Sequence, residues 1–275
     1  MGRPHIATRY EEFRMVGATG LREAIRLGHY RGHTAGLADG KLQADVVILP
    51  NGLADDFLEY CMRNPKSLPL VGVNRAGDPS LPTLGDIDVR TDLPQYDVFH
   101  AGPRTWSRSD IISLWRDDLV AFALGGTFTF EHMLQQNRIE VRHVAMSQNV
   151  PLYRSSIRTQ SVGVFGGYMV VSMRPIRKDL VDRVRAMTAR FPHAHGSPVH
   201  VGDPAEIGID DVDNPDWGDA VEVHRDEIPV FWASGLTAQS VLKCSTPEMF
   251  ITNTPGHMLI TDLDADADVG QFRLF

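Results

Sequence analysis

This 275-residue chain has few cysteines, no excess of positive charge and no long apolar runs. Its two cysteines, Cys61 and Cys244, exclude a disulfide scaffold and favour a reduced compartment. With a formal net charge of −8, it lacks the basic surface that phosphate backbones require, so nucleic acid is not an expected partner. No apolar run reaches the roughly 18–20 residues that span a bilayer, and residues 1–13 lack the apolar centre of a signal peptide. We therefore expect a cytoplasmic protein without a membrane partner.

The sequence signatures of several common enzyme classes are absent as well. The chain has no GxGxxG after a strand and no GxxxxGK[ST], so no nucleotide cofactor is expected. It also has no HExxH, GxSxG or CxxC, which removes the simplest hydrolase interpretations. What is present, 43% hydrophobic and 23% charged residues, is typical of a globular protein with a large core.

Two apolar runs around a helical pattern predict an α/β fold. QADVVILP (43–50) and LPLVGV (68–73) are uninterrupted, and DDFLEYCMRNP lies between them. Continuous apolar runs are typical of strands buried on both faces, as in parallel sheets. We therefore predict a βαβ unit within a mostly parallel sheet flanked by helices.

The hydrophobic pattern of the sequence changes in its second half. Between residues 138 and 203, alternating strand patterns surround one amphipathic helix at 177–191. This arrangement predicts a smaller α+β domain, 138–203, inserted into a main α/β domain made of residues 1–137 and 204–275.

Two segments repeat one pattern. LVAFALGGTFTFEHML (119–134) and IPVFWASGLTAQSVL (228–242) both run from an apolar strand through a small residue, a glycine and a hydroxyl to a helix start. Crossovers of this kind place helix N-termini at one edge of an open parallel sheet, where ligands bind. We expect these two turns and the Pro-Gly corner at 255–256 to form one cleft for a small anion.

Candidate site residues gather at the two repeated turns. Thr127 begins an expected helix with Glu131 in its first turn, and these two either cap the helix or hold a substrate and move a proton. Ser234, Gly235 and Thr237 occupy the matching place in the second segment, where they either line a pocket or serve only the turn.

Further candidates lie at the Pro-Gly corner and at strand ends. His257 follows the corner directly and has Asp262 on the following strand, so the two are either site residues or an exposed histidine and a strand acid. Lys66 and Arg154 stand beside turns, as surface charges or as clamps for an anion.

One stretch concentrates residue types that bind metals. PHAHGSPVHVGDP holds His193, His195, His200 and Asp203, and imidazole with carboxylate suits zinc or manganese. Because the spacing is irregular, a turn followed by a polar strand edge is the alternative.

Eight strings, in this order, resemble the D-glutamate cyclase family, whose bacterial members are named as hydro-lyases. The resemblance runs from about Arg22 to Asp262. It departs from the family at two turns, where Gly-Cys-Ser and Ala-Cys-Gly are replaced by GGT (125–127) and ASG (233–235), and at Asn253, where the family tends to have His. A mechanism that uses a thiol at these turns is therefore not expected here. The strings are YCMRNPKSLPLVGV, DVRTDLPQYDVF, ALGGTFTFE, NVPLYRSSI, MVVSMRP, HGSPVHVGDPAEIGI, VFWASGLTAQ and ITNTPGHMLITD.

The resemblance implies an α/β domain with an inserted α+β domain, and a hydro-lyase of amino-acid metabolism that converts D-glutamate to 5-oxo-D-proline and water. Ring closure makes the amine an intramolecular nucleophile, which needs a base, an acid and oxyanion donors. For these roles we expect His257 as base, Glu131 as acid and turn N–H groups near Thr127 and Gly235 as oxyanion donors. Arg154 or Lys66 would then hold the α-carboxylate.

The same resemblance suggests a divalent cation such as Mn²⁺, with His200, Asp203 and Asp262 as ligands, and a small anionic amino acid as the substrate. Two alternatives stay open: a dehydratase of another small dicarboxylate or amino acid, and a non-catalytic small-molecule sensor. The sequence also leaves open whether the protein forms a homo-oligomer.

Overall fold

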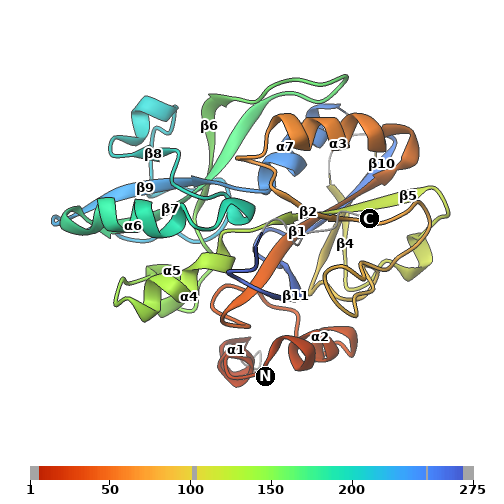
Figure 1. Cartoon of the computed structure of the whole chain (residues 1–275), viewed down its shortest axis with the longest axis horizontal. Helices are drawn as coiled ribbons and strands as arrows, with labels where there is room; N and C mark the ends of the chain where they lie inside the picture. The colour runs from red at the N-terminus through yellow and green to blue at the C-terminus, as the bar shows by residue number, and fades with distance from the viewer. Residues whose placement is uncertain (1–5, 101–103, 246, 269–275) are drawn as a thin grey trace, which may run out of the picture.

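The computed structural model describes residues 6–100, 104–245 and 247–268 of the chain, and its strands form two antiparallel sheets (Figure 1). The larger sheet has the order β2-β5-β1-β10-β3-β4, with β11 also paired to β1. Its strands are β1 (Lys41–Pro50), β2 (Leu70–Val73), β3 (Tyr96–His100), β4 (Arg104–Arg108), β5 (Leu119–Gly125), β10 (Met249–Asn253) and β11 (Leu259–Asp264).

The prediction of a mostly parallel sheet is wrong. The strands predicted at 43–50 and 68–73 exist as β1 and β2 with the helix α3 (Ala54–Arg63) between them, but β5 lies between these two strands and runs antiparallel to both. An uninterrupted apolar run reports burial on both faces and says nothing about strand direction.

Both faces of the larger sheet are in fact covered. Val47 and Leu49 of β1 pack in a cluster with apolar side chains of α3 and of α7 (Leu236–Ser245). Val46 and Ile48 point to the opposite face, where they pack against the irregular segment 81–93. Loops therefore cover the second face, a face that we expected helices to cover.

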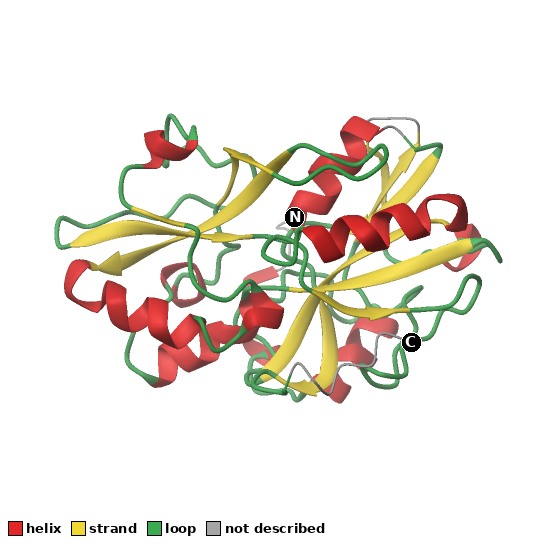
Figure 2. Ribbon diagram, turned by 45° about the horizontal axis from the view of Figure 1, so that its top comes forward, coloured by secondary structure: helices red, strands yellow, loops and turns green. Residues whose placement is uncertain are grey.

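The smaller sheet, order β6-β7-β9-β8, lies beside the larger one (Figure 2). One of its faces packs against α4, α5 and α6 in one apolar cluster, whereas the other faces a separate cluster that includes Ile207, Ile209 and Val221. The division into domains stays a prediction; the smaller sheet includes β9, which lies beyond the 203 boundary. Its elements are β6 (Leu152–Arg158), β7 (Tyr168–Arg177), β8 (His200–Val201), β9 (Glu227–Ala233), α4 (Phe128–Gln136), α5 (Arg142–Ala145) and α6 (Val181–Thr188).

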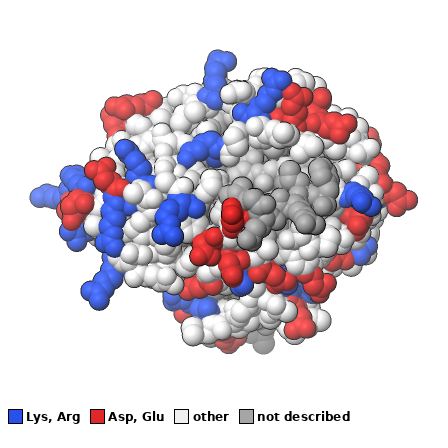
Figure 3. Space-filling view, in the orientation of Figure 1, with Lys and Arg blue, Asp and Glu red and all other residues white. Residues whose placement is uncertain are grey.

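The chain begins with two short helices, α1 (Ile6–Phe13) and α2 (Ala18–Arg26), and α2 packs against β11. Within the described ranges, none of the helices combines the length and apolar character needed to cross a bilayer. On the face shown in Figure 3, Lys and Arg side chains gather at the end of the molecule that carries α6. The overall negative charge is thus unevenly distributed over the surface.

Gly125 ends β5 at a point where the backbone of the segment 192–194 crosses closely. A β-carbon built on Gly125 would collide with the backbone carbonyl oxygen of His193, which cannot turn aside as a side chain would. We predict that Gly125→Ala lowers the free energy of unfolding by about 1–3 kcal/mol, measured by urea titration.

The matched control is Gly52→Ala, because a β-carbon on Gly52 meets nothing within 4 Å. Equal stability of the two variants would contradict this account of the close approach.

Candidate active site

A carboxylate interrupts the apolar face of β1, at a gap in the sheet. β1 pairs with β11 at Ala44 and with β10 from Val47 onward, and residues 254–258 leave the sheet between these two pairings. The side chain of Asn253 fills the gap: its Oδ1 accepts the N–H of Val46 at 2.8 Å, and its Nδ2 donates to Oδ1 of Asp45 at 2.8 Å. Asn253 therefore fixes one oxygen of the Asp45 carboxylate.

The other oxygen of this carboxylate has no partner. Asp45 is 7% exposed, and its Oδ2 is buried without a hydrogen bond among the described residues. Burial raises the pKa of Asp45 to about 6, despite the opposing effect of the Asn253 hydrogen bond. A carboxyl group with this pKa accepts and returns a proton near neutral pH, as a general base and acid must.

Asp45 faces a cavity of about 10 Å³, the room of roughly one water molecule. Its walls come from both sheets and from the loops at 149–151 and 254–258. They are mostly apolar, with Asp45 and two hydroxyls as the polar side chains. The lining residues are Asp45, Thr127, Phe128, Val150, Leu152, Ser234, Leu236, Pro255, Gly256 and Met258.

Two helices begin at this cavity, since their first residues, Phe128 of α4 and Leu236 of α7, both line it. Within the described part of the chain, no acceptor takes the backbone N–H of Thr127, Phe128 or Gly235. Buried N–H groups ordinarily have a partner, and helix N-termini favour anions. Each helix start can therefore hold a carboxylate or an oxyanion.

The two glycine turns and the Pro-Gly corner meet at this cavity, although the sheet that we expected to bring them together is antiparallel. Thr127, Ser234 and Gly256 line it, and a β-carbon on Gly235 would meet Oδ2 of Asp45. Thr237 instead has a structural position, because its hydroxyl donates to the carbonyl of Ser234 at 2.7 Å.

Glu131 lies one layer behind the cavity wall, buried in an ion pair. Its Oε1 is 3.1 Å from Nε2 of His143 and accepts hydrogen bonds from Arg174. Burial pushes the pKa of the Glu131 carboxyl up, but His143 and Arg174 outweigh it and hold the pKa below its ordinary value. A group kept ionised in this way is poorly suited to donate a proton.

The structure places His257 and Asp262 outside the cavity wall formed by the described residues. Nδ1 of His257 is 3.0 Å from the carbonyl oxygen of Pro255, and burial lowers the pKa of its imidazole. Asp262 forms an ion pair with Arg22, at 2.7 Å, on the partly exposed side of β11.

The two predicted anion clamps are also engaged elsewhere. Lys66 donates to the carbonyl oxygens of His195 and Ser197 and so ties down that turn. Arg154 pairs with Asp216 and stacks over the ring of Trp217, 4.5 Å from its centre.

The predicted manganese ligands do not fit a metal site. Nε2 of His200 is 2.7 Å from the backbone carbonyl oxygen of Asp203, and the carboxylate of Asp203 accepts the N–H of Ala205 at 3.0 Å. Asp262 is committed to Arg22. Over the described residues, no three or more His, Cys, Asp or Glu side chains are grouped to hold a metal ion.

Sequence reasoning missed Asp45. A signal was available: an acid inside the uninterrupted apolar run QADVVILP is costly to bury and therefore requires an explanation. The apolar pattern of this strand indicates that Asp45 is buried, and a charged side chain at a buried position indicates a functional site.

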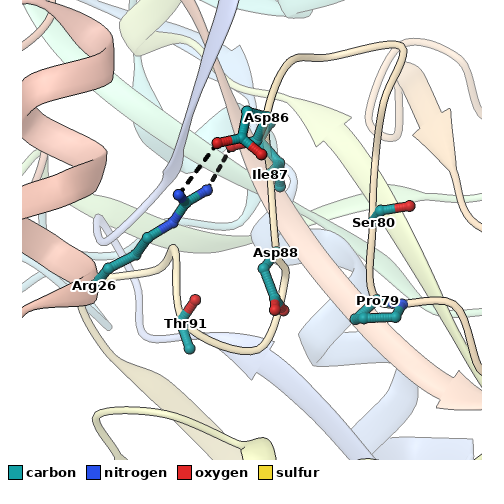
Figure 4. A pocket seen from close by; sticks show the side chains of 7 residues that line it. All are labelled: Arg26, Pro79, Ser80, Asp86, Ile87, Asp88 and Thr91. Atoms are coloured by element: carbon teal, nitrogen blue, oxygen red, sulfur yellow. Dashed lines mark hydrogen bonds and ion pairs between the residues drawn. The ribbon is translucent and has the colours of Figure 1, made fainter.

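A larger cavity, of about 410 Å³, lies between Arg26 and the loop 79–91 (Figure 4). Its charged walls are already paired. Arg26 is 2.6 Å from Asp92 and 3.3 Å from Asp86, and Asp88 is 2.7 Å from Arg90. The smaller cavity is therefore the better candidate, because its carboxylate has an oxygen without a partner.

Comparison with known proteins agrees with the resemblance seen in the sequence. The model of the D-glutamate cyclase family matches residues 120–262, more than half of the chain. A protein of Jannaschia sp. (strain CCS1) named "Putative hydro-lyase" is 51% identical over 252 residues, 91% of this chain and 95% of its own. Proteins of the same description from Bordetella petrii (52% identical; 88% of this chain, 92% of theirs) and Dinoroseobacter shibae (50%; 92% and 85%) are similar. The chain belongs to the D-glutamate cyclase family.

A solved structure, that of a nitrogen repressor-like protein from Methanococcus jannaschii, aligns over 88% of this chain and 96% of its own, with 9% identity. Its TM-score of 0.37 is too low to support an argument.

The raised pKa of Asp45 has a consequence for stability. Because the folded protein holds this proton more tightly than the unfolded chain, whose carboxyl has a pKa of 3.8, stability falls as the pH rises from about 4 to about 6 and then levels off. Asp45→Asn removes the charge, so we predict that it raises the free energy of unfolding at pH 8 by up to about 3 kcal/mol.

This gain should shrink toward zero as the pH is lowered to 4, measured by urea titration at each pH. The control, Asp264→Asn, removes an exposed carboxylate on β11 that pairs with Lys41, and should show no such gain. A variant at Asp45 that is less stable than the wild type at pH 8 would contradict the assignment.

Proposed function

We propose that this protein is a carbon–oxygen lyase that closes D-glutamate to 5-oxo-D-proline with loss of water, and that Asp45 carries the protons. The observation that carries this proposal is the unpaired Oδ2 of Asp45, buried where two helices begin. Membership of the D-glutamate cyclase family and the hydro-lyase names of the relatives support the reaction class.

The charges around the cavity suit an amino dicarboxylate. The ammonium group of such a substrate complements the carboxylate of Asp45, and each of its two carboxylates complements one helix N-terminus. The N–H groups of Thr127 and Phe128 serve one carboxylate, and that of Gly235 serves the other. The apolar lining, such as Val150 and Leu236, accommodates the methylene groups between them.

Asp45 alone can move both protons that the reaction requires. Its Oδ2 takes a proton from the ammonium group and passes it to an oxygen of the γ-carboxylate. The amine then attacks the γ-carbon, and a C–N bond forms. Asp45 removes a second proton from this nitrogen and delivers it to the same oxygen, whereupon the C–O bond breaks and water leaves. The carboxylate ends as it began, and orientation of the two ends of one molecule supplies much of the rate.

Substrate entry requires the cavity to widen, because its volume of about 10 Å³ is too small for an amino acid. Two of its walls are loops rather than strands, and they are joined where Nδ2 of Asn149 donates to the carbonyl oxygen of Pro255 at 3.1 Å. Separation of these two loops at this hydrogen bond would widen the cavity.

The test is incubation of purified protein with D-glutamate, with and without Mn²⁺, while 5-oxoproline is measured by proton NMR. We expect turnover by the wild type, a loss of at least about 100-fold in Asp45→Asn, and wild-type rates in Asp264→Asn. Binding of D-glutamate without turnover would favour the sensor. Loss of water from a different acid would favour another dehydratase, and either result overturns the proposal.

A further inference from the structure

Arg174 of β7 is a guanidinium buried directly behind the cavity wall, with 1% exposure. Its Nη2 donates to Oγ1 of Thr127 at 2.9 Å, its Nε donates to Oε1 of Glu131 at 3.0 Å, and its Nη1 donates to Oγ of Ser172 at 3.0 Å. The ring centres of Phe130 and Trp232 each lie 5.4 Å from the guanidinium carbon. All of these contacts hold the guanidinium in one orientation.

This orientation decides what the Thr127 hydroxyl can do. A hydroxyl has one hydrogen and two lone pairs, whereas a guanidinium has only hydrogens to offer. Oγ1 of Thr127 must therefore accept from Arg174, and its own hydrogen is left for another acceptor. No described residue accepts that hydrogen, and Thr127 lines the cavity that Asp45 faces.

Glu131 and His143, neither of which lines the cavity, complete the arrangement. The carboxylate of Glu131 engages the Nε edge of Arg174, and Nε2 of His143 lies 3.1 Å from the same carboxylate oxygen. Arg174 donates to this oxygen through both Nε and Nη2, so the second hydrogen of Nη2 is the one directed at Thr127. A buried ion pair is often no more stabilising than apolar side chains of similar volume, so stability alone is a weak reason for placing one here.

We propose that Arg174 is a positioning residue, which keeps the Thr127 hydroxyl as a hydrogen-bond donor to the oxyanion that forms on the substrate. This rests on the proposed function of the same cavity. The positive charge behind the hydroxyl also strengthens its donation, as in other charge-assisted hydrogen bonds. Glu131, expected from the sequence to be an acid, then acts on the substrate only through Arg174 and Thr127.

A double-mutant cycle separates this role from a merely structural one. Thr127→Val removes the hydroxyl and keeps the shape, and we expect it to lower kcat by about 100-fold with little change in KM, because the donor acts in the transition state. Thr127→Ser, which keeps the hydroxyl, should recover most of this loss. Arg174→Lys keeps the charge and loses the donor to Thr127, and should lower kcat by a similar factor.

The combined variant should be no slower than Thr127→Val alone, since both changes remove the same donor. If the two losses multiply instead, Arg174 acts independently of Thr127 and the proposal is overturned. The matched control is Thr261→Val, which removes another buried hydroxyl, one that donates to the carbonyl of Leu42 at 2.8 Å, outside the cavity wall. Its kcat should stay within about threefold of wild type, although its stability falls by about 1 kcal/mol.

Should Arg174→Lys fail to fold, Arg174→Met combined with Glu131→Gln replaces it, because this pair leaves no unpaired charge buried. The same cycle is also run on the Kd of D-glutamate, measured by calorimetry. If the wild type binds D-glutamate without closing the ring, the proposed reaction fails and no oxyanion forms. The Thr127 hydroxyl would then act on the bound carboxylate, and coupled losses of affinity would support the positioning role. Additive effects on Kd, an unchanged Kd in this case, or no binding at all overturn it.

Discussion

The desolvated carboxylate of Asp45 is the constraint around which this fold is arranged. A buried acid on a central strand requires a hydrogen-bond partner. The sheet supplies one at the point where the pairing of β1 is interrupted between β11 and β10. Asn253 then bonds to both the strand backbone and the acid. The break releases residues 254–258 as a turn, and that turn is one wall of the cavity. Regular strand pairing is therefore interrupted at the position of the proposed catalytic carboxylate.

The second constraint is that the site lies where the two sheets meet. β5 of the larger sheet leads through a glycine turn into α4, which packs against the smaller sheet, and β9 of the smaller sheet leads through the other glycine turn into α7, which packs against the larger one. Each sheet therefore contributes one helix start to the cavity. Unpaired polar atoms at such a junction cost stability, and proteins retain costs of this kind mainly at functional sites.

Much of this arrangement could be predicted from the sequence, because local patterns determine it. The strands at 43–50 and 68–73, and the strand–turn–helix pattern of 119–134 and 228–242, appear where expected. The direction of the strands could not be obtained in this way, since burial on both faces produces the same apolar run in either orientation. Pairing between distant segments, such as β1 with β10, leaves no mark on either segment alone.

The site itself was predictable in outline but not in its central residue. Turns with glycine and hydroxyl residues point to helix starts, and two of them meet at the cavity. Lys66 and Arg154 have the right chemistry for anion clamps, yet their partners come from distant parts of the chain and cannot be seen in the sequence. His257 instead lies against the carbonyl of Pro255, two residues before it, and the sequence does not show that its ring lies outside the cavity wall. Asp45 is easily missed for a different reason. The apolar residues on either side of it are enough to predict a buried strand, so the acid itself receives no separate explanation.

The central claim is most directly tested by following the carboxyl carbon of Asp45 by NMR as the pH is changed. In protein labelled with ¹³C at the aspartate carboxyl carbon, the signal of Asp45 is the one that disappears in Asp45→Asn. The account predicts a titration midpoint near pH 6. A midpoint near the ordinary aspartate value of about 4 would show that this carboxylate is not desolvated, and it would contradict the role given to it here.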